Sequence, residues 1–149
     1  MTNAEYRNGN AEKSGFDNWM TPQSLIDDLE LEFGAMFDPC PAWTQTNVPY
    51  FDGLSIDWSL TNVNFVNPPY SDMKAWVKKC HNEWKKGATV ILLIPPRTCT
   101  KYFHNYIYGN AELRFIKGRV KFIHPETGEG KAAPFPSMLC IFYGGFSLC

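Results

Sequence analysis

Apolar residues recur at helical spacing in two stretches of the chain, and each stretch predicts an amphipathic helix. The first stretch follows Thr21-Pro22, a pair that favours a helix start because threonine caps the first turn and proline fits the first helical position. Glycine ends both patterns, at Gly34 and at Gly87. We expect a first helix over about residues 22–33 and a second one that ends before residue 87. The apolar positions of the two stripes are Leu25, Ile26, Leu29 and Phe33, and then Met73, Trp76, Val77, Cys80 and Trp84.

Short apolar runs without helical spacing predict strands at residues 35–37, 63–66, 90–94, 113–116 and 138–143. The run at 90–94 is continuously apolar, which is typical of a parallel strand that is covered on both faces. With the strand and helix before it, this run predicts a βαβ unit. A short helix is expected around residues 101–108. The pattern therefore predicts an α/β sheet, mostly parallel, with a hairpin-like antiparallel edge at the C-terminus.

The composition fits one globular domain. The 149 residues include 44% hydrophobic and 15% aromatic side chains, which is enough for a packed core. Residues 1–15 are polar and aperiodic, so we expect a disordered N-terminal segment and a single domain over residues 16–149. No run has the apolar length of a secretion signal or a membrane span, which favours a soluble cytoplasmic protein. The net charge of −1 leaves any contact with nucleic acid to a local basic patch.

Cysteine and histidine spacing argues against metal and disulfide chemistry. The five cysteines are odd in number and form no C-x-x-C pair, so we expect reduced thiols and no metal site. The three histidines, His81, His104 and His124, show no ligand spacing and are expected at the surface or in packing.

Proline-bearing segments follow three of the predicted strands. These segments are Asp38-Pro39-Cys40, then Asn67-Pro68-Pro69-Tyr70, and then Pro95-Pro96-Arg97. In open α/β sheets the ligand binds outside the carboxyl ends of the strands. The sequence therefore predicts that the three segments converge on one rim of the sheet and form a site there.

The segment Asn67-Pro68-Pro69-Tyr70 is the most informative of the three. Two consecutive prolines fix the backbone and supply no N–H, so the carbonyls of Asn67 and Pro68 remain as rigid acceptors. The Asn67 side chain adds a third acceptor, and together they suit the amino group of an aryl amine. Tyr70 can lie against the ring that carries this amine. The alternative is an ordinary loop, because prolines with Asn and Tyr also mark turns.

Several further motifs extend over nearly the whole chain. They are Trp19-Met20-Thr21-Pro22, Phe37-Asp38-Pro39-Cys40, Asp52-Gly53-Leu54 with Asp57-Trp58, Asn67-Pro68-Pro69-Tyr70-Ser71, the residues 95–100, Gly118-Arg119-Val120-Lys121-Phe122 and Ala133-Pro134-Phe135-Pro136-Ser137-Met138. In these motifs the chain resembles the small phage-type DNA N6-adenine methyltransferases of the Dam kind, which use S-adenosylmethionine. The resemblance implies a methyltransferase domain over residues 16–149, with a compact, pared-down Rossmann-like sheet.

The resemblance also implies a mechanism. The target adenine would be flipped out of double-stranded DNA, stacked on Tyr70 and held through its amino group by Asn67 and the Pro68 carbonyl, with Pro69 completing the bend. Hydrogen bonds accepted from the amine would make its nitrogen more nucleophilic, and alignment with the sulfonium methyl group would supply most of the remaining rate. No general base, metal or covalent nucleophile is required.

For the cofactor, the resemblance points to residues at the start of the first helix and after the first strand. Thr21 and Pro22, with Trp19 nearby, match the family element that contacts the methionine portion of the cofactor. The strand-end motif under the cofactor corresponds to Asp38, Pro39 and Cys40. Asp57 is the expected polar contact to the cofactor's adenine. Core packing is an equal alternative for Trp19 and Trp58, and a turn carboxylate is the alternative for Asp38.

The chain departs from the usual methyltransferase pattern after its first strand. A glycine loop and an acidic residue on the ribose are usual there, whereas Pro41-Ala42-Trp43 stands in this chain. Asp52 is the candidate to contact the ribose in place of that acidic residue. Either the sheet is pared down, or a second subunit in a homodimer completes the pocket.

The DNA contact is predicted in the C-terminal third. The basic residues Lys117, Arg119, Lys121 and Lys131 flank the irregular segment 124–136, which we expect to be a surface loop. If a strand passes through 117–121, three of these charges point to one face and suit a phosphate backbone. The alternative is a charged edge strand that discourages aggregation. Arg97 is open between a phosphate contact and a surface charge.

Two other functions fit the same residues. A glutamine side chain, a guanine or an RNA base also presents a planar amino group to such a clamp, although residues 118–122 and 133–138 resemble the DNA enzymes. A non-catalytic DNA-binding relative of the fold is the alternative from a different class. Degenerate relatives usually lose the clamp, and this chain retains all four of its residues.

Overall fold

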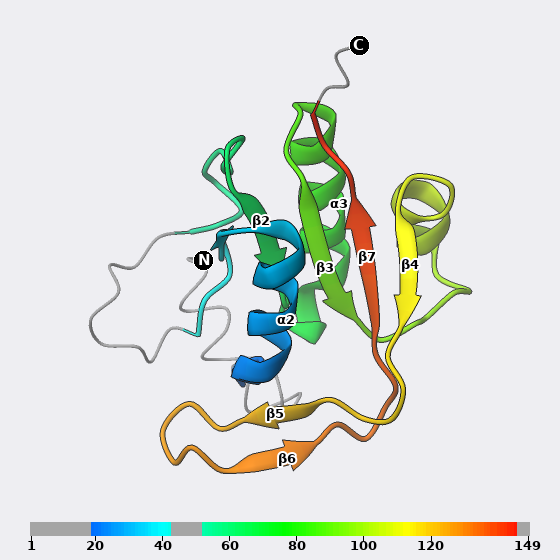
Figure 1. Ribbon diagram of the computed structural model, residues 1–149. Coiled ribbons are helices and arrows are strands. Elements are labelled where there is room, and N and C mark those ends of the chain that lie inside the picture. Colours follow the sequence, from blue (N-terminus) through cyan, green and yellow to red (C-terminus); the bar gives the residue numbers. More distant parts are fainter. Residues whose placement is uncertain (1–18, 43–51, 146–149) are drawn as a thin grey trace.

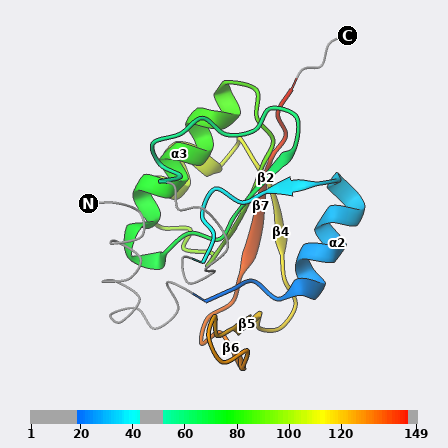
Figure 2. The same cartoon turned by 90° about the vertical axis from the view of Figure 1, so that its left-hand side faces the viewer.

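Two helices cover opposite faces of a β-sheet in the computed structural model, which describes residues 19–42 and 52–145 (Figures 1 and 2). The predicted disordered start at 1–15 lies outside the described residues, as do Trp43 and Cys149. The helices are α2 (Gln23–Phe33) and α3 (Met73–Lys85). The shorter turns are a 3₁₀ turn at Tyr70–Asp72 and a π-helical turn at Phe103–Ile107.

The main sheet of the described region has five strands in the order β1-β2-β3-β7-β4. The strands are β1 (Met36–Phe37), β2 (Val63–Val66), β3 (Val90–Ile94), β4 (Glu112–Phe115) and β7 (Met138–Phe142). β1, β2 and β3 are parallel, while β7 runs antiparallel to both of its neighbours. This confirms an α/β fold with the predicted strand-helix-strand unit.

The predicted arrangement of the sheet was wrong in one respect. The last strand, β7, was expected at an antiparallel edge, but it lies inside the sheet between β3 and β4, and β4 forms the edge. Two of the ladders are therefore antiparallel, and the sheet is mixed and not mostly parallel. The reason is visible in the sequence of β7, whose five residues are all buried, as an interior strand requires.

The core has two layers, one on each side of the sheet. Alternate residues of β3 face opposite sides, so Val90, Leu92 and Ile94 pack towards α3 while Ile91 and Leu93 pack towards α2. All five residues of β3 are buried, as the continuous apolar run predicted. The helix α2 is also tied to the edge strand β4, because Glu32 forms a bidentate ion pair with Arg114 at 2.7 Å.

A two-stranded hairpin lies beyond the carboxyl ends of β2 and β3 (Figure 1). It consists of β5 (Lys121–Ile123) and β6 (Gly130–Ala132), which pair antiparallel. The segment 124–136 was predicted to be a loop without strands, and this was wrong because Gly130–Ala132 belongs to β6. The predicted strand through 117–121 is also absent, since Gly118 has a φ of 77° and the chain bends there before β5 begins.

The first helix begins one residue later than predicted. Pro22 is its N-cap and not its first helical residue, and the Pro22 carbonyl accepts hydrogen bonds from the N–H groups of Leu25 and Ile26. The Thr21 hydroxyl is therefore not the cap and is available to another partner. Among the described helices, none has the length and apolar character that crossing a membrane requires.

Candidate active site

Asn67 stands immediately after β2 and makes one side-chain hydrogen bond. Its amide nitrogen Nδ2 donates to the Thr21 hydroxyl oxygen over 3.3 Å. Within the described residues, no donor reaches the other end of the amide, the oxygen Oδ1. The side chain is half-buried, so this oxygen is an oriented acceptor at the edge of the sheet where the parallel strands end.

The two prolines place a second acceptor beside it. Pro68 and Pro69 are both buried, and the Pro69 carbonyl accepts the N–H of Asp72 over 3.1 Å, which starts the 3₁₀ turn. None of the described residues donates to the Pro68 carbonyl. Neither proline has an N–H of its own to offer as a donor, so this turn presents acceptors and no donors at Pro68 and Pro69. Asn67 and Pro68 thus offer the pair of acceptors that the sequence predicted.

The ring of Tyr70 is held by an aromatic partner from a distant part of the chain. Phe135, in the connection between β6 and β7, packs edge-on against Tyr70 with the ring centroids 5.0 Å apart and an interplanar angle of 88°. Such T-shaped pairs have a preferred geometry that fixes both rings. Asn67, Pro68, Pro69 and Tyr70 are called the clamp below.

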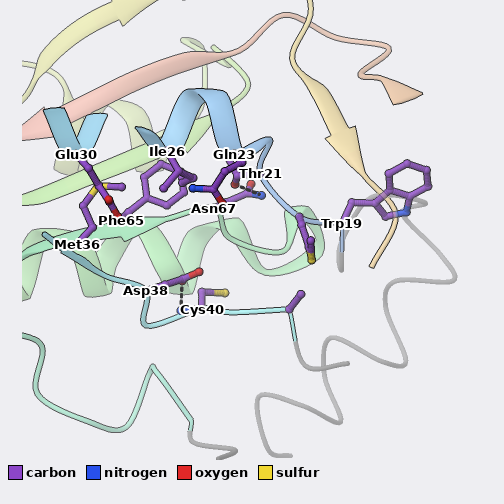
Figure 3. A pocket seen from close by; sticks show the side chains of 12 residues that line it. Trp19, Thr21, Gln23, Ile26, Glu30, Met36, Asp38, Cys40, Phe65 and Asn67 are labelled. Atoms are coloured by element: carbon purple, nitrogen blue, oxygen red, sulfur yellow. Dashed lines mark hydrogen bonds between the residues drawn. The ribbon is translucent and has the colours of Figure 1, made fainter. Parts of the chain in front are cut away.

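A pocket of about 250 Å³ adjoins the clamp (Figure 3). One of its walls is α2 and another is the end of β1, so it lies where the N-terminal part of α2 meets the carboxyl ends of the strands. The lining combines polar and apolar side chains. The described lining residues are Trp19, Met20, Thr21, Gln23, Ile26, Glu30, Met36, Asp38, Cys40, Ala42, Phe65 and Asn67.

The segment after β1 presents a carboxylate and a thiol to this pocket. One oxygen of Asp38 accepts the backbone N–H of Cys40 over 2.8 Å, which is the turn arrangement weighed as an alternative for this residue. Cys40 is buried and is not part of a disulfide among the described residues. Pro39 is also buried and lies behind the pocket against Gly53, so it shapes the segment without lining the cavity.

Trp19 and Met20 connect the pocket to the hairpin. Met20 and Ile123 exchange two backbone hydrogen bonds of 2.8 and 2.9 Å, which form an antiparallel bridge between the pocket wall and β5. The indole of Trp19 packs edge-on against His124, with centroids 5.1 Å apart, and points away from Asp38 and Cys40 in Figure 3. The hairpin and the clamp are therefore parts of one connected arrangement.

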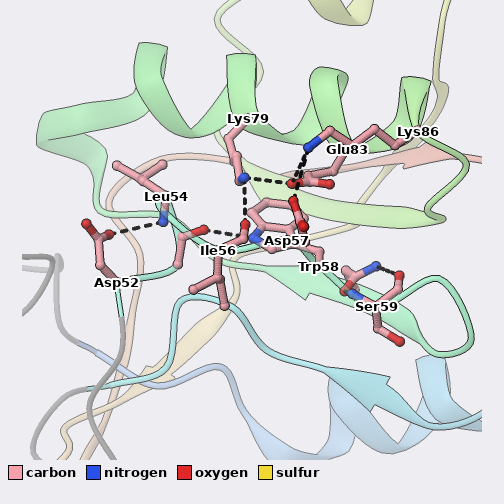
Figure 4. Close-up of polar contacts among 11 residues, drawn as sticks. Asp52, Leu54, Ile56, Asp57, Trp58, Ser59, Lys79, Glu83 and Lys86 are labelled. Atoms are coloured by element: carbon pink, nitrogen blue, oxygen red, sulfur yellow. Dashed lines mark hydrogen bonds and ion pairs between the residues drawn. The ribbon is translucent and has the colours of Figure 1, made fainter.

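The structure does not bring Asp57 to the pocket. Its carboxylate pairs with Lys86 over 3.2 Å, just beyond the last residue of α3 (Figure 4). The clamp precedes the first residue of the same helix, and a helix of 13 residues is about 20 Å long. Asp57 is thus at the opposite end of the sheet from Asn67. The ion pair with Asp57 and the nearby Glu83 raise the pKa of Lys86.

Asp52 is not among the described lining residues of the pocket, and its carboxylate is used by its own turn. Its carboxylate accepts the N–H of Leu54 over 3.1 Å and the hydroxyl of Ser55 over 2.8 Å. The following Gly53 accepts the indole N–H of Trp58 over 2.8 Å, and Trp58 stacks on Trp76 in the core. The core alternative for Trp58 is therefore the one that the structure shows.

The predicted DNA-contacting residues are all exposed, but they do not form the expected row. Lys117 and Arg119 lie in the bend between β4 and β5, and only Lys121 is in a strand. Lys121 is paired with Ala132, whereas Lys131 is opposite Phe122, so the two lysines point to different faces of the hairpin. Arg97 follows the carboxyl end of β3 after two prolines and is also exposed.

Sequence reasoning missed most of the pocket wall. Gln23, Ile26 and Glu30 line the pocket from α2, and their spacing of three and four residues places them on one helical face. That spacing is a usable signal, but the apolar stripe by itself predicts only a core position for Ile26. Met36 and Phe65 come from β1 and β2, where the alternation of strand residues decides which side chain faces α2.

Two further cysteines are part of the core. Cys80 and Cys140 are buried between α3 and the sheet, and burial raises the pKa of the Cys140 thiol to about 12. Cys99 is exposed, and the described cysteines form no disulfide with one another. The described residues contain no group of three or more His, Cys, Asp or Glu that is able to hold a metal ion.

The site therefore combines two unused acceptors with an adjoining pocket at the carboxyl ends of parallel strands. Comparison with known proteins adds the family. The family of DNA N-6-adenine-methyltransferases (Dam) matches residues 8–146, and the chain belongs to it. A DNA N-6-adenine-methyltransferase of Escherichia phage T1 is 24% identical over 151 residues, covering 87% of this chain. The match spans 63% of the length of that phage relative.

Proposed function

We propose that this protein methylates the N6 amino group of adenine in double-stranded DNA, using S-adenosylmethionine as the methyl donor. The observation that supports this most directly is the pair of acceptors at Asn67 and Pro68. An adenine amino group has two N–H bonds, and the Asn67 Oδ1 atom and the Pro68 carbonyl are two neighbouring acceptors that the described residues leave unused. Family membership gives the chemistry in which such an amine is methylated.

The residues of the clamp supply catalysis by orientation and charge. As the amine attacks, positive charge develops on its nitrogen, and acceptors fixed before the reaction stabilise that charge without reorganising. The proline-proline bend keeps the Pro68 carbonyl fixed, and Thr21 keeps the Asn67 amide in the acceptor-out orientation. We propose that Tyr70 stacks on the adenine after the base leaves the duplex, because a stacked base inside DNA does not expose its amine to a clamp of this kind.

The pocket lining suits S-adenosylmethionine. Ile26, Met36 and Phe65 offer an apolar surface for the adenosyl group, while Asp38 and Glu30 offer carboxylates for the ammonium and hydroxyl groups. The cofactor supplies an electrophilic sulfonium methyl group when bound. Its expected holders in the lining are Trp19, Thr21, Asp38 and Cys40, joined here by Gln23, Ile26, Glu30, Met36 and Phe65. Pro22 and Pro39 do not line the pocket and shape the backbone beside these holders. The parallel strands β1–β3 with the pocket at their carboxyl ends support a pared-down Rossmann-like fold for the domain at 16–149.

The partner in this proposal is double-stranded DNA in the cytoplasm of a bacterial host. Arg97, Lys117, Arg119, Lys121 and Lys131 are exposed and are the proposed contacts to the phosphates of this DNA. We also propose that a second subunit completes the pocket in a homodimer. Sedimentation of the full chain measures whether the dimer forms.

The test is transfer of tritium from labelled S-adenosylmethionine to DNA from a methylation-free strain, with fully adenine-methylated DNA as the control substrate. We expect label as N6-methyladenine only in the first DNA, and a loss of rate on the order of 100-fold or more in Asn67→Ala, since a fixed polar contact to the reacting centre is removed. Label in protein glutamine or in RNA would show that the substrate is that molecule and not DNA adenine. Cofactor binding without transfer to any substrate would favour the non-catalytic alternative.

The cofactor site has its own measurement. Calorimetry on Asp38→Ala should show weaker S-adenosylmethionine binding than on wild type, because a charged acceptor leaves the pocket wall. Asp57→Ala is the matched control, as that carboxylate lies at the far end of α3. Equal binding by wild type and Asp38→Ala would remove Asp38 from the cofactor site.

A further inference from the structure

Within the clamp, the side chains of Asn67 and Tyr70 are both held by residues that adjoin the hairpin β5–β6. The amide of Asn67 is bonded to Thr21, and Thr21 follows Met20, whose backbone is bridged to Ile123 of β5. The ring of Tyr70 is packed by Phe135, which follows β6 by a few residues. The two contacts come from opposite ends of the hairpin and meet at the same four-residue segment.

Thr21 is placed for this role, because the start of α2 does not use its hydroxyl. The helix α2 is capped at Pro22 without a side-chain hydrogen bond, so the Thr21 hydroxyl is not needed to cap it. Its oxygen accepts from Asn67 Nδ2 instead. An amide whose nitrogen is bonded in this way has its oxygen on the opposite side, and a flipped amide would present N–H groups to a substrate that itself donates.

Phe135 fixes Tyr70 in a comparable way. The ring contact is close to perpendicular, with an interplanar angle of 88°, so the edge of one ring meets the face of the other. The ring pair restrains the orientation that Tyr70 offers to a base. Phe135 is itself packed against the core layer under α2, which includes Val120 and Phe122 of the hairpin region.

We propose that Thr21 and Phe135 are positioning residues for Asn67 and Tyr70, and that the hairpin β5–β6 is the brace that holds both. This rests on the proposed function for the substrate that the clamp receives. Neither residue needs to touch the reacting atoms. The brace sets the acceptor of Asn67 and the plane of Tyr70 before DNA arrives, and distortion of the hairpin disturbs both together.

The bridge to Met20 can be broken without breaking the hairpin. The Ile123 N–H donates to the Met20 carbonyl and the Ile123 carbonyl accepts the Met20 N–H, whereas the β5–β6 ladder uses Phe122 and Lys131. Ile123→Pro therefore removes a bond to Met20 and leaves that ladder in place. Ala132→Pro is the matched control, because Ala132 is paired with Lys121 at a position where the N–H points out of the hairpin. Both prolines enter strands of the same hairpin.

The first measurement is nuclear magnetic resonance on protein labelled with ¹⁵N-asparagine, with the Asn67 side-chain signal assigned by its loss in Asn67→Ala. We expect Thr21→Val and Ile123→Pro to shift this signal, and Thr21→Ser and Ala132→Pro to leave it in place. An unchanged Asn67 amide in Thr21→Val overturns the role of Thr21, and an unchanged amide in Ile123→Pro overturns the brace. This readout does not depend on methyl transfer, so it separates failure of the brace from failure of the proposed function.

The second measurement is the kinetics of methyl transfer with saturating cofactor. Thr21→Val should lower kcat by about five- to ten-fold, the worth of one ordinary hydrogen bond, and Thr21→Ser should restore it. An effect confined to the cofactor's dissociation constant would assign Thr21 to cofactor contact alone and overturn its positioning role.

Phe135 is tested against Tyr70 in a double-mutant cycle. Phe135→Leu should weaken turnover in the wild-type background and have no further effect in Tyr70→Ala, because its influence passes through that ring. Equal effects in both backgrounds would show that Phe135 does not act through Tyr70. Absence of any methyl transfer by the wild-type chain would instead overturn the proposed function and leave the resonance test standing.

Discussion

At the residue scale, the clamp is distinguished by two acceptors that have no donor among the described residues. Two adjacent prolines remove the N–H groups that would normally pair with nearby carbonyls, and the Asn67 amide is turned by Thr21 so that its oxygen remains available. An unused acceptor is costly in a closed protein interior, which makes it informative at the edge of a pocket. Binding of an amino group would satisfy the acceptors of Asn67 and Pro68 at the same time.

Tyr70 is the residue whose contribution can be separated from hydrogen bonding. Tyr70→Ala should weaken binding of the extruded base by about 1–3 kcal/mol if the ring stacks on it, while Tyr70→Phe should stay close to wild type. The measurement is fluorescence of 2-aminopurine placed at the target adenine, titrated with each variant. A large loss in Tyr70→Phe would show that the phenol hydroxyl matters and that stacking is not the main contribution.

At the scale of elements, the hairpin β5–β6 joins the pocket to the exposed basic residues. Met20 bridges to β5, Trp19 packs on His124, and Phe135 leads from β6 to Tyr70. Arg119 and Lys121 are exposed at the start of this hairpin. A contact with the phosphate backbone there would therefore be linked to the clamp through the contacts of the hairpin.

Arg119→Ala combined with Lys121→Ala should reduce DNA affinity and lower the slope of log K against log salt by about two, because each phosphate contact contributes about 0.9. Binding of the cofactor should not change. Lys78→Ala with Lys85→Ala is the matched control, since it removes the same charge from the exposed side of α3. If both pairs show the same slope in a fluorescence-anisotropy titration, the hairpin is not the DNA contact.

The connection of α2 to β4 predicts acid sensitivity. The Arg114 guanidinium hydrogen-bonds to Glu32 and lowers the pKa of that carboxyl below its ordinary value of 4.5. A group with a lowered folded pKa stabilises the fold above its unfolded pKa, and the contribution is lost as the pH falls through the folded pKa. Glu32→Gln should therefore lower Tm at pH 7, and the difference from wild type should shrink below about pH 4.5.

Thermal melts of both proteins between pH 3 and pH 7 measure this difference. Asp28→Asn is the control on the same helix, since the described residues give Asp28 no hydrogen-bond partner. A gap between wild type and Glu32→Gln that is constant with pH would mean that the lost stability comes from packing and not from the ion pair.

At the scale of the whole molecule, residues 52–58 before β2 pack against the core. A Cβ atom on Gly53 would lie 1.9 Å from the Pro39 carbonyl oxygen and 2.9 Å from Trp76. Lys79 of α3 holds the same segment through the Ile56 carbonyl at 2.7 Å and is paired with the buried Glu83 (Figure 4). This packing fixes the segment after β1 from behind.

Gly53→Ala should destabilise the protein by about 1–3 kcal/mol, the usual cost of overpacking, since the Pro39 backbone has to move. Weaker cofactor binding should accompany the loss because Asp38 and Cys40 lie on either side of Pro39. Leu60→Ala, in an exposed part of the same segment, should stay within about 0.5 kcal/mol. Denaturant unfolding of the three proteins measures both values, and wild-type stability in Gly53→Ala would show that the close approach is relieved cheaply.

The sequence by itself determined the local elements and the clamp. The helical stripes, the continuous run of β3 and the proline pair each depend on residues close in the chain, where periodicity and backbone restriction act directly. These patterns located α2, α3, β2, β3 and the acceptors of Asn67 and Pro68 almost to the residue. Family motifs added the chemistry.

Only the tertiary structure decided which distant segments meet. The position of β7 inside the sheet, the short strand β6 in a glycine-rich segment and the remoteness of Asp57 depend on pairings across many residues, which no local period records. The same holds for Thr21, whose hydroxyl matches a helix cap by sequence but bonds to Asn67, 46 residues away. A hydroxyl bonds to the partner that the fold places near it, and that placement is a property of the packed chain and not of its neighbours in sequence.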